Sequence, residues 1–158
     1  MKRSLLLLLS SCLCLLIVFT GCGAPSDYPA DIPVTVEPTA DDPEGLITID
    51  NIVITSGTLD RDYFTPAAGQ HTAGEPCFLV SLRIINGYDE DCWVTFSVDG
   101  FNTSGNQVSF TLDTGPRAGA WQVYLASDSS AEYTLHLSWA DSVTDMIISS
   151  DRTVRIAP

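Results

Sequence analysis

Residues 77–86 read CFLVSLRIIN, and residues 92–99 read CWVTFSVD. Large apolar side chains occupy every second position of both runs: Phe78, Val80, Leu82 and Ile84, then Val94, Phe96 and Val98. Successive side chains of a β-strand point to opposite faces, so each run predicts a strand with one apolar face. Asn86-Gly87 and three acidic residues lie between the runs, which is typical of a turn.

The same alternation, in bursts separated by Gly, Asn, Asp and Pro, continues in both directions. It predicts further strands over residues 46–55, 107–112, 121–126, 132–139, 146–149 and 153–156. No stretch has sustained helical periodicity. Residues 45–158 therefore predict an all-β fold, an Ig-like antiparallel two-sheet sandwich of seven to eight strands. A closed barrel would have a similar pattern and remains the alternative.

The N-terminus has the features of an export signal. Lys2 and Arg3 precede an almost wholly apolar run over residues 5–19. This run is shorter than the roughly 20 residues that span a bilayer. The segment ending in Thr20-Gly21-Cys22 resembles the lipobox of bacterial lipoproteins, although Phe19 is unusual at its position. The alternatives are an ordinary cleaved signal with an incidental cysteine and an uncleaved N-terminal anchor.

This resemblance implies that a diacylglycerol is attached to the Cys22 sulfur and that the chain is cut after Gly21. Residues 1–21 would then be a lipoprotein signal peptide, and the protein would stay on the extracytoplasmic face of the cell membrane. Residues 22–44 would be the lipidated cysteine and a disordered linker with five prolines, six acidic residues and no basic ones. An extended linker of this length could reach roughly 70 Å.

Residues 78–86 and 93–100, followed by a Gly/Pro-rich bend at residues 115–119, resemble the Ig-like domains of small Gram-positive lipoproteins of unknown function. The resemblance implies the fold alone and transfers no site residues.

The charge balance excludes one class of partner. After Cys22 the chain has no lysine and five arginines against 20 acidic residues, a formal charge of −15. Such a chain repels phosphate backbones and anionic lipid headgroups. We therefore expect no nucleic-acid partner, and we expect the lipid on Cys22 to provide all of the membrane attachment.

Only Cys77 and Cys92 remain beside the lipidated cysteine after processing. In a simple hairpin they would lie at opposite ends of the first strand, roughly 25 Å apart. A disulfide needs Cα atoms within about 7 Å, so we expect no bridge.

Nothing in the sequence has the arrangement of a catalytic or metal site. His71 and His136 are the only histidines, and we expect both to be solvated. The acidic turn at residues 89–91, and Asp60 with Asp62, lack the spacing of a calcium loop. We therefore expect no enzymatic activity, no cofactor and no metal.

Two aromatic residues, Trp93 and Tyr124, are the candidate ligand-binding residues. By alternation each lies on the polar face of its strand, where it could stack on a sugar or a partner chain. The alternative is that Trp93 packs in the core, as in Ig domains, or at a sheet edge. The sequence thus predicts a membrane-tethered, non-enzymatic binding or structural module for an envelope protein or glycan. The alternative function is a cell-wall or glycan-associated enzyme accessory or carbohydrate-binding module.

Overall fold

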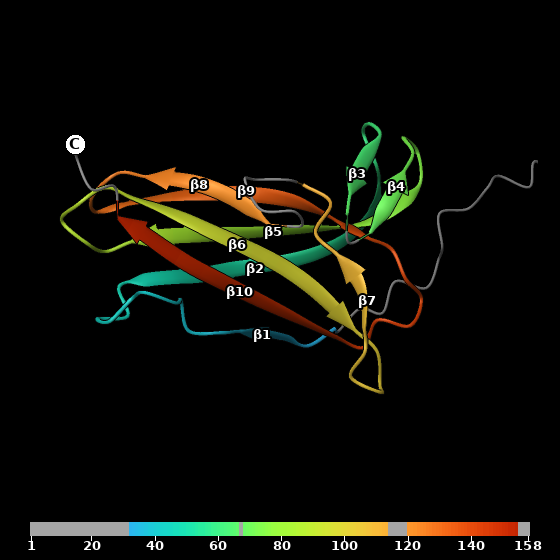
Figure 1. Ribbon diagram of the computed structural model, residues 1–158, viewed down its shortest axis with the longest axis horizontal. Helices are drawn as coiled ribbons and strands as arrows, with labels where there is room; N and C mark the ends of the chain where they lie inside the picture. The colour runs from blue at the N-terminus through green and yellow to red at the C-terminus, as the bar shows by residue number, and fades with distance from the viewer. Residues whose placement is uncertain (1–31, 67, 114–119, 155–158) are drawn as a thin grey trace, which may run out of the picture.

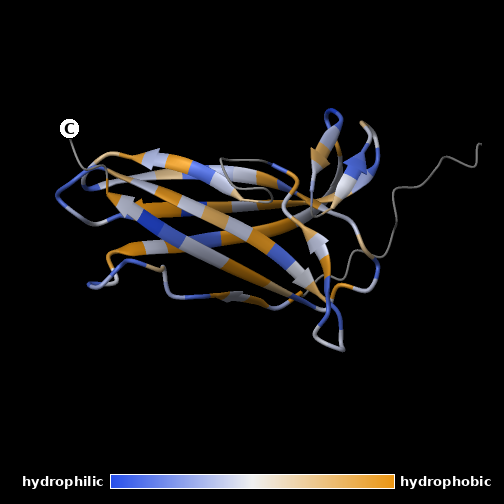
Figure 2. Cartoon of the chain, viewed as in Figure 1, coloured by the Kyte–Doolittle hydropathy of each residue, from blue (hydrophilic) through white to orange (hydrophobic). Residues whose placement is uncertain are grey.

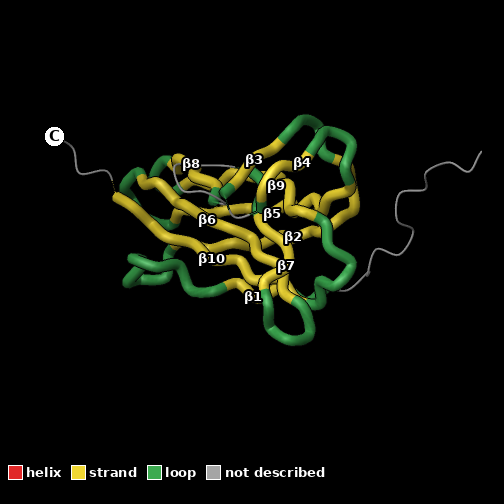
Figure 3. Tube along the Cα trace, turned by 45° about the vertical axis from the view of Figure 1, so that its right-hand side comes forward, coloured by secondary structure: helices red, strands yellow, loops and turns green. Residues whose placement is uncertain are grey.

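The computed structural model describes residues 32–66, 68–113 and 120–154. These residues form ten β-strands joined by turns, without a helix (Figure 3). No helix that could cross a membrane is found among them. The predicted signal peptide (residues 1–21), Cys22 and the bend at residues 115–119 lie outside the described residues.

One sheet has three antiparallel strands in the order β2-β5-β9. These strands are β2 (Ile47–Thr58), β5 (Pro76–Asn86) and β9 (Ser129–Ser138). The central strand β5 is the run from which the fold was predicted, and both neighbours pair along most of its length. A bulge between Asp50 and Val53 interrupts the pairing of β2.

The second sheet has five strands around the central strand β6 (Cys92–Phe101). On one side of β6 lies β10 (Asp145–Val154), antiparallel over ten residue pairs. On its other side, β8 (Trp121–Leu125) pairs with the first half of β6, and β7 (Gln107–Phe110) pairs with the second half. The outermost strand, β1 (Val34–Val36), runs parallel to β10.

The two sheets face each other, and β3 (Tyr63–Thr65) and β4 (Gly69–His71) form a separate hairpin at one end (Figure 1). Hydrophobic positions, coloured orange, recur along the strands of both sheets (Figure 2). Apolar residues of both sheets pack together in one core cluster. The alternating residues of β5 and β6 are all buried there, and Leu135, Leu137, Met146 and Ile148 complete the centre of the core. This confirms the predicted all-β sandwich, with eight strands in its two sheets.

The last strand differs from the prediction. The sequence predicted two short strands, residues 146–149 and 153–156, but β10 is continuous from Asp145 to Val154. Ser150 and Arg152 are buried on the same face as Ile148, so the inward alternation continues through polar residues. A pattern based on apolar residues alone could not detect this.

The linker boundary must also be corrected. Residues 33–40, predicted to belong to a disordered linker, lie along β10 in the structure. Glu37 and Ala40 donate backbone hydrogen bonds to β10, whereas Pro33 contributes its carbonyl oxygen. Proline lacks an N–H and is therefore tolerated at a sheet edge. The domain thus begins at or before Ile32, and not at Gly45.

Candidate functional site

Trp93 and Tyr124, the two residues singled out from the sequence, lie directly opposite each other on β6 and β8. Their ring centroids are 5.4 Å apart at an interplanar angle of 62°, an edge-to-face arrangement. Trp93 is half-buried and Tyr124 is 46% exposed. Their strand neighbours Val94 and Val123 are buried in the core. Trp93 therefore belongs to the outer face of the sheet, and not to the core.

Polar groups of three kinds border this pair. Asp91 accepts hydrogen bonds from the Tyr124 hydroxyl and from the backbone N–H of Ser127, the latter at 2.9 Å. The hydrogen bond from Tyr124 lowers the pKa of the Asp91 carboxyl. Gln122 and Thr95 lie opposite each other in the next row, with Gln122 Nε2 3.4 Å from Thr95 Oγ1. We call Trp93, Tyr124, Asp91, Thr95 and Gln122 the aromatic face.

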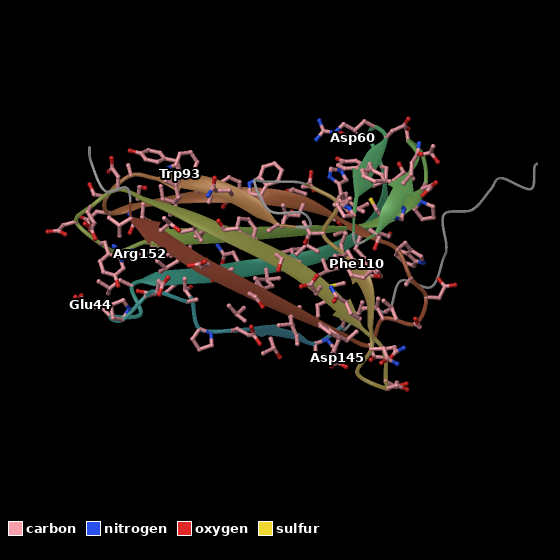
Figure 4. The ribbon with its side chains drawn as sticks, viewed as in Figure 1. Glu44, Asp60, Trp93, Phe110, Asp145 and Arg152 are labelled. Carbon is pink, nitrogen blue, oxygen red and sulfur yellow. The ribbon has the colours of Figure 1, made fainter. Side chains whose placement is uncertain are left out.

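The loops beside the aromatic face are held by buried polar groups. The Asn86 side-chain amide donates to the carbonyl oxygens of Glu90 and Ala126, both at 2.9 Å, and so joins the loop after β5 to the loop after β8. Arg152 donates to the Glu90 carboxylate at 2.5 Å and lies 3.7 Å from the centroid of the Tyr88 ring. These hydrogen bonds hold the two loops to each other and to β10. Figure 4 shows Trp93 and Arg152 at the same end of the molecule. This network was not predictable from a local pattern, because Ala126 and Arg152 lie 40 and 62 residues from their partners Asn86 and Glu90.

A second group of titratable side chains lies beside β3, at the end of the sandwich opposite the aromatic face. The Tyr63 hydroxyl donates to Asp60 Oδ1 at 2.8 Å and lies 3.1 Å from His136 Nδ1. Since the single hydroxyl proton of Tyr63 points to Asp60, Nδ1 of His136 is the donor in the second contact. Asp113 Oδ2 is 3.3 Å from the same nitrogen. Burial, followed by the hydrogen bond to Asp60, raises the pKa of Tyr63.

The prediction that both histidines are solvated was wrong. The His136 side chain is 17% exposed and is held between Tyr63 and Asp113. His71 is 22% exposed and lies 3.1 Å from the Glu75 carboxylate. The partners of His136 come from segments more than 20 residues away, so strand alternation could not reveal them.

The sequence has two clusters of acidic residues, at residues 89–91 and at Asp60 with Asp62. Four of these five side chains bind different partners. Glu90 binds Arg152 and Asp91 binds Tyr124, whereas Asp60 binds Tyr63 and Asp62 accepts from the N–H of Ala73. Among the residues that the structure describes, no group of three or more His, Cys, Asp or Glu side chains is placed to hold a metal ion.

Two shallow hollows lie elsewhere on the surface. One, of about 340 Å³, lies over the β2-β5-β9 sheet beside the bulge and is lined in part by Asn51, Val53 and Thr134. The other, of about 290 Å³, lies beside β3 and is lined in part by Tyr63 and Phe64. Neither hollow includes a residue of the aromatic face.

Cys77 and Cys92 are both buried and free, which confirms the prediction that they form no disulfide. Cys92 lies in the main core, whereas Cys77 packs in a second cluster with Leu59, Tyr63 and Leu112.

Comparison with known proteins gives few relatives. No protein-family model matches the chain, and no curated protein matches it. A solved structure, the crystal structure of Campylobacter jejuni cj0090, aligns at 9% sequence identity with a TM-score of 0.37. The alignment covers 78% of this chain and 100% of that chain. At this similarity no property passes from that protein to this one.

Proposed function

We propose that this protein is a lipid-anchored, extracytoplasmic binding protein without enzymatic activity, and that the aromatic face binds a glycan. The lipobox-like segment ending at Cys22 supports the anchor and the location. The edge-to-face pair of half-buried Trp93 and exposed Tyr124 on the outer face of the sheet is the single observation that carries the binding function.

The chemistry of the aromatic face fits a sugar. The C–H faces of a pyranose ring are apolar and pack against aromatic rings, and its hydroxyl groups need donors and acceptors nearby. The carboxylate of Asp91, the amide of Gln122 and the hydroxyl of Thr95 supply such groups around the pair. The formal charge of −15 after Cys22 disfavours phosphate-rich polymers, so a neutral or amino-sugar glycan is the expected ligand.

The distribution of exposed apolar side chains argues against a large protein interface centred elsewhere. In the described part of the chain, the exposed large apolar residues are Val36, Val53, Phe64 and Tyr124. They lie on four different strands, β1, β2, β3 and β8, which belong to three different sheets. A stable protein interface commonly buries about 800 Å² on each partner around a shared apolar centre.

The test is cosedimentation of the full-length protein, purified in detergent, with insoluble cell-wall glycan. We expect Trp93→Ala and Tyr124→Ala each to weaken binding by about tenfold or more, because buried aromatic anchors dominate such contacts. Phe64→Ala is the matched control, since Phe64 is 69% exposed on β3 and lies outside the aromatic face. Its binding should be unchanged, and all three variants should melt cooperatively.

Equal binding by Trp93→Ala and the parent protein would contradict the proposal. If the protein binds no glycan but captures an envelope protein, and this capture is lost in Trp93→Ala and Tyr124→Ala, the ligand of the aromatic face is a protein.

A further inference from the structure

Residues 33–40, which precede β2, are attached to β10 by backbone hydrogen bonds. Pro33 O accepts from Met146 N at 2.9 Å, and Glu37 N donates to Ile148 O at 2.9 Å. Further along, Ala40 exchanges two hydrogen bonds with the strand, donating to Ser150 O at 2.9 Å and accepting from Arg152 N at 3.0 Å. The segment is therefore an edge strand of the sandwich.

Side chains fix both ends of this segment. At its start, Ile32 and Val34 pack against the main core. At its end, Asp42 accepts hydrogen bonds from the backbone N–H groups of Leu46 and Ile47, at 3.1 and 2.9 Å. Undocking the segment would expose the apolar side chains and break charge-assisted hydrogen bonds, so the docked state is favoured.

The parallel direction of β1 decides where the chain enters the sandwich. Val34 lies beside Met146, at the start of β10, and Ala40 lies beside Asp151, near its end. The ten residues of β10 span about 30 Å. Trp93 is paired with Thr153, at the far end of this strand. Figure 4 accordingly shows Asp145 at one end of the molecule, and Trp93, Arg152 and Glu44 at the other.

The position of the first docked residue also limits the tether. Nine residues separate Cys22 from Ile32, so the chain between them can span at most about 35 Å. If residues 32–44 were free, the domain would instead be attached at Gly45, next to Glu44. The attachment point would then move to the end that carries the aromatic face. When β1 is docked, the end of the sandwich at the start of β10 is nearest the lipid. When β1 is free, the end that carries the aromatic face is nearest.

We propose that docking of residues 32–42 on β10 orients the anchored molecule, so that the aromatic face points away from the membrane and toward glycan outside it. This inference rests on the proposed lipid anchor at Cys22. The turn at residues 102–106, which joins β6 to β7, is then the part of the sandwich closest to the bilayer.

The experiment measures energy transfer from the lipidated full-length protein to acceptor lipids in vesicles. Donors are attached to single cysteines introduced by Ser104→Cys, in the turn after β6, or Ser127→Cys, in the turn after β8. Both native thiols are buried, and burial raises the pKa of each, so the introduced thiol is labelled selectively. Because the two positions are about 30 Å apart along the strands, transfer from position 104 should be at least about twofold higher.

A pair of variants tests the role of β1. Ile32→Asp with Val34→Asp introduces charge on the side that packs against the core, and we expect it to reverse the order of the two transfer efficiencies. Thr35→Asp with Val36→Asp adds the same charge at exposed positions of the same strand, and should leave the order unchanged.

Sedimentation of the vesicles before each measurement separates the two proposals. If the protein does not sediment with the vesicles, the anchor fails and the orientation fails with it. If the protein sediments but both positions transfer equally, or position 127 transfers more, the anchor stands and the orientation is wrong.

Discussion

Asp42 is the residue that ties the N-terminal segment to the rest of the sandwich. Its carboxylate accepts from Leu46 N, Ile47 N and the Tyr88 hydroxyl. Burial raises the pKa of this carboxyl, but the hydrogen bonds from Tyr88, Ile47 and Leu46, together with the Arg152 charge, outweigh burial and lower it. The stability that Asp42 contributes is thus fully present above its ordinary value of 3.8 and is lost as pH falls through the lower folded value.

We therefore expect Asp42→Asn to lower the free energy of unfolding by about 1–3 kcal/mol at neutral pH, since hydrogen bonds to a charged group are lost. At an acidic pH below 3.8 the parent protein loses the same contribution progressively, so the difference should shrink. Urea unfolding at both pH values measures this. Glu44→Gln, at an exposed carboxylate in the same turn, is the control and should show neither effect. A pH-independent difference would contradict the assignment.

The two cysteines give a second test at the level of single residues. Burial raises the pKa of Cys77 to about 11, and burial also raises the pKa of Cys92. The thiolate is the reactive form, so neither thiol should react with a disulfide reagent in the native protein. Both should react in denaturant without prior reduction. Thiols that appear only after reduction would show a disulfide and contradict the structure.

Trp93 and His136 show what alternation can and cannot predict. Alternation places Trp93 on the face of β6 opposite its buried apolar side chains, and in the structure Trp93 is half-buried on that face. His136 also lies on the polar face of its strand, where solvation was expected. Asp113 and Tyr63 cover it because the chain between β7 and β8 and the β3–β4 hairpin fold over that end of β9. Such contacts depend on tertiary structure and leave no local pattern.

At the level of elements, β5 and β6 were predictable and β1 was not. Each of the first two strands has one continuous apolar face, which the core requires. An edge strand such as β1 needs only a few backbone hydrogen bonds on one side. The segment around β1 is acidic and rich in proline, a composition that is equally compatible with an unfolded linker. Strands β3 and β4, of three residues each, are too short for any periodic pattern.

Gly100 shows how closely β6 and β7 approach. A Cβ atom at this position would lie 2.9 Å from Cβ of Ser109 and 3.1 Å from Cγ2 of Val143. We expect Gly100→Ala to cost about 1–3 kcal/mol of stability because a buried, well-packed strand pair must separate. Thermal or urea unfolding measures the loss.

Gly57→Ala is the matched control for this prediction. Its new Cβ would lie 2.7 Å from Cδ1 of Leu79, the end of a flexible and only partly buried side chain. Leu79 can rotate away, so the loss should be smaller than at Gly100. If both variants lose the same stability, the close approach of β6 to β7 is not the reason that Gly100→Ala is destabilising.

At the level of the whole molecule, the negative charge of the protein bears on how it attaches to the membrane. The chain after Cys22 has 20 acidic residues against five arginines, and two of the arginines, Arg83 and Arg152, bind Asp50 and Glu90. A surface of this kind is repelled by anionic headgroups, and the repulsion acts over a Debye length of about 8 Å at physiological salt. We therefore expect electrostatic attraction to anionic headgroups to contribute nothing to membrane attachment.

Replacement of the proposed lipidation site tests this conclusion directly. We expect Cys22→Ser to release the protein from the membrane fraction or to leave it unprocessed, because two acyl chains provide stable anchoring and the serine cannot carry the thioether-linked lipid. Cell fractionation with immunodetection measures the distribution. Cys14→Ser is the matched control, since Cys14 lies within the predicted signal peptide and its loss should leave the protein bound. Membrane retention of Cys22→Ser equal to that of the parent would refute the lipid anchor, and with it the orientation that β1 is proposed to impose.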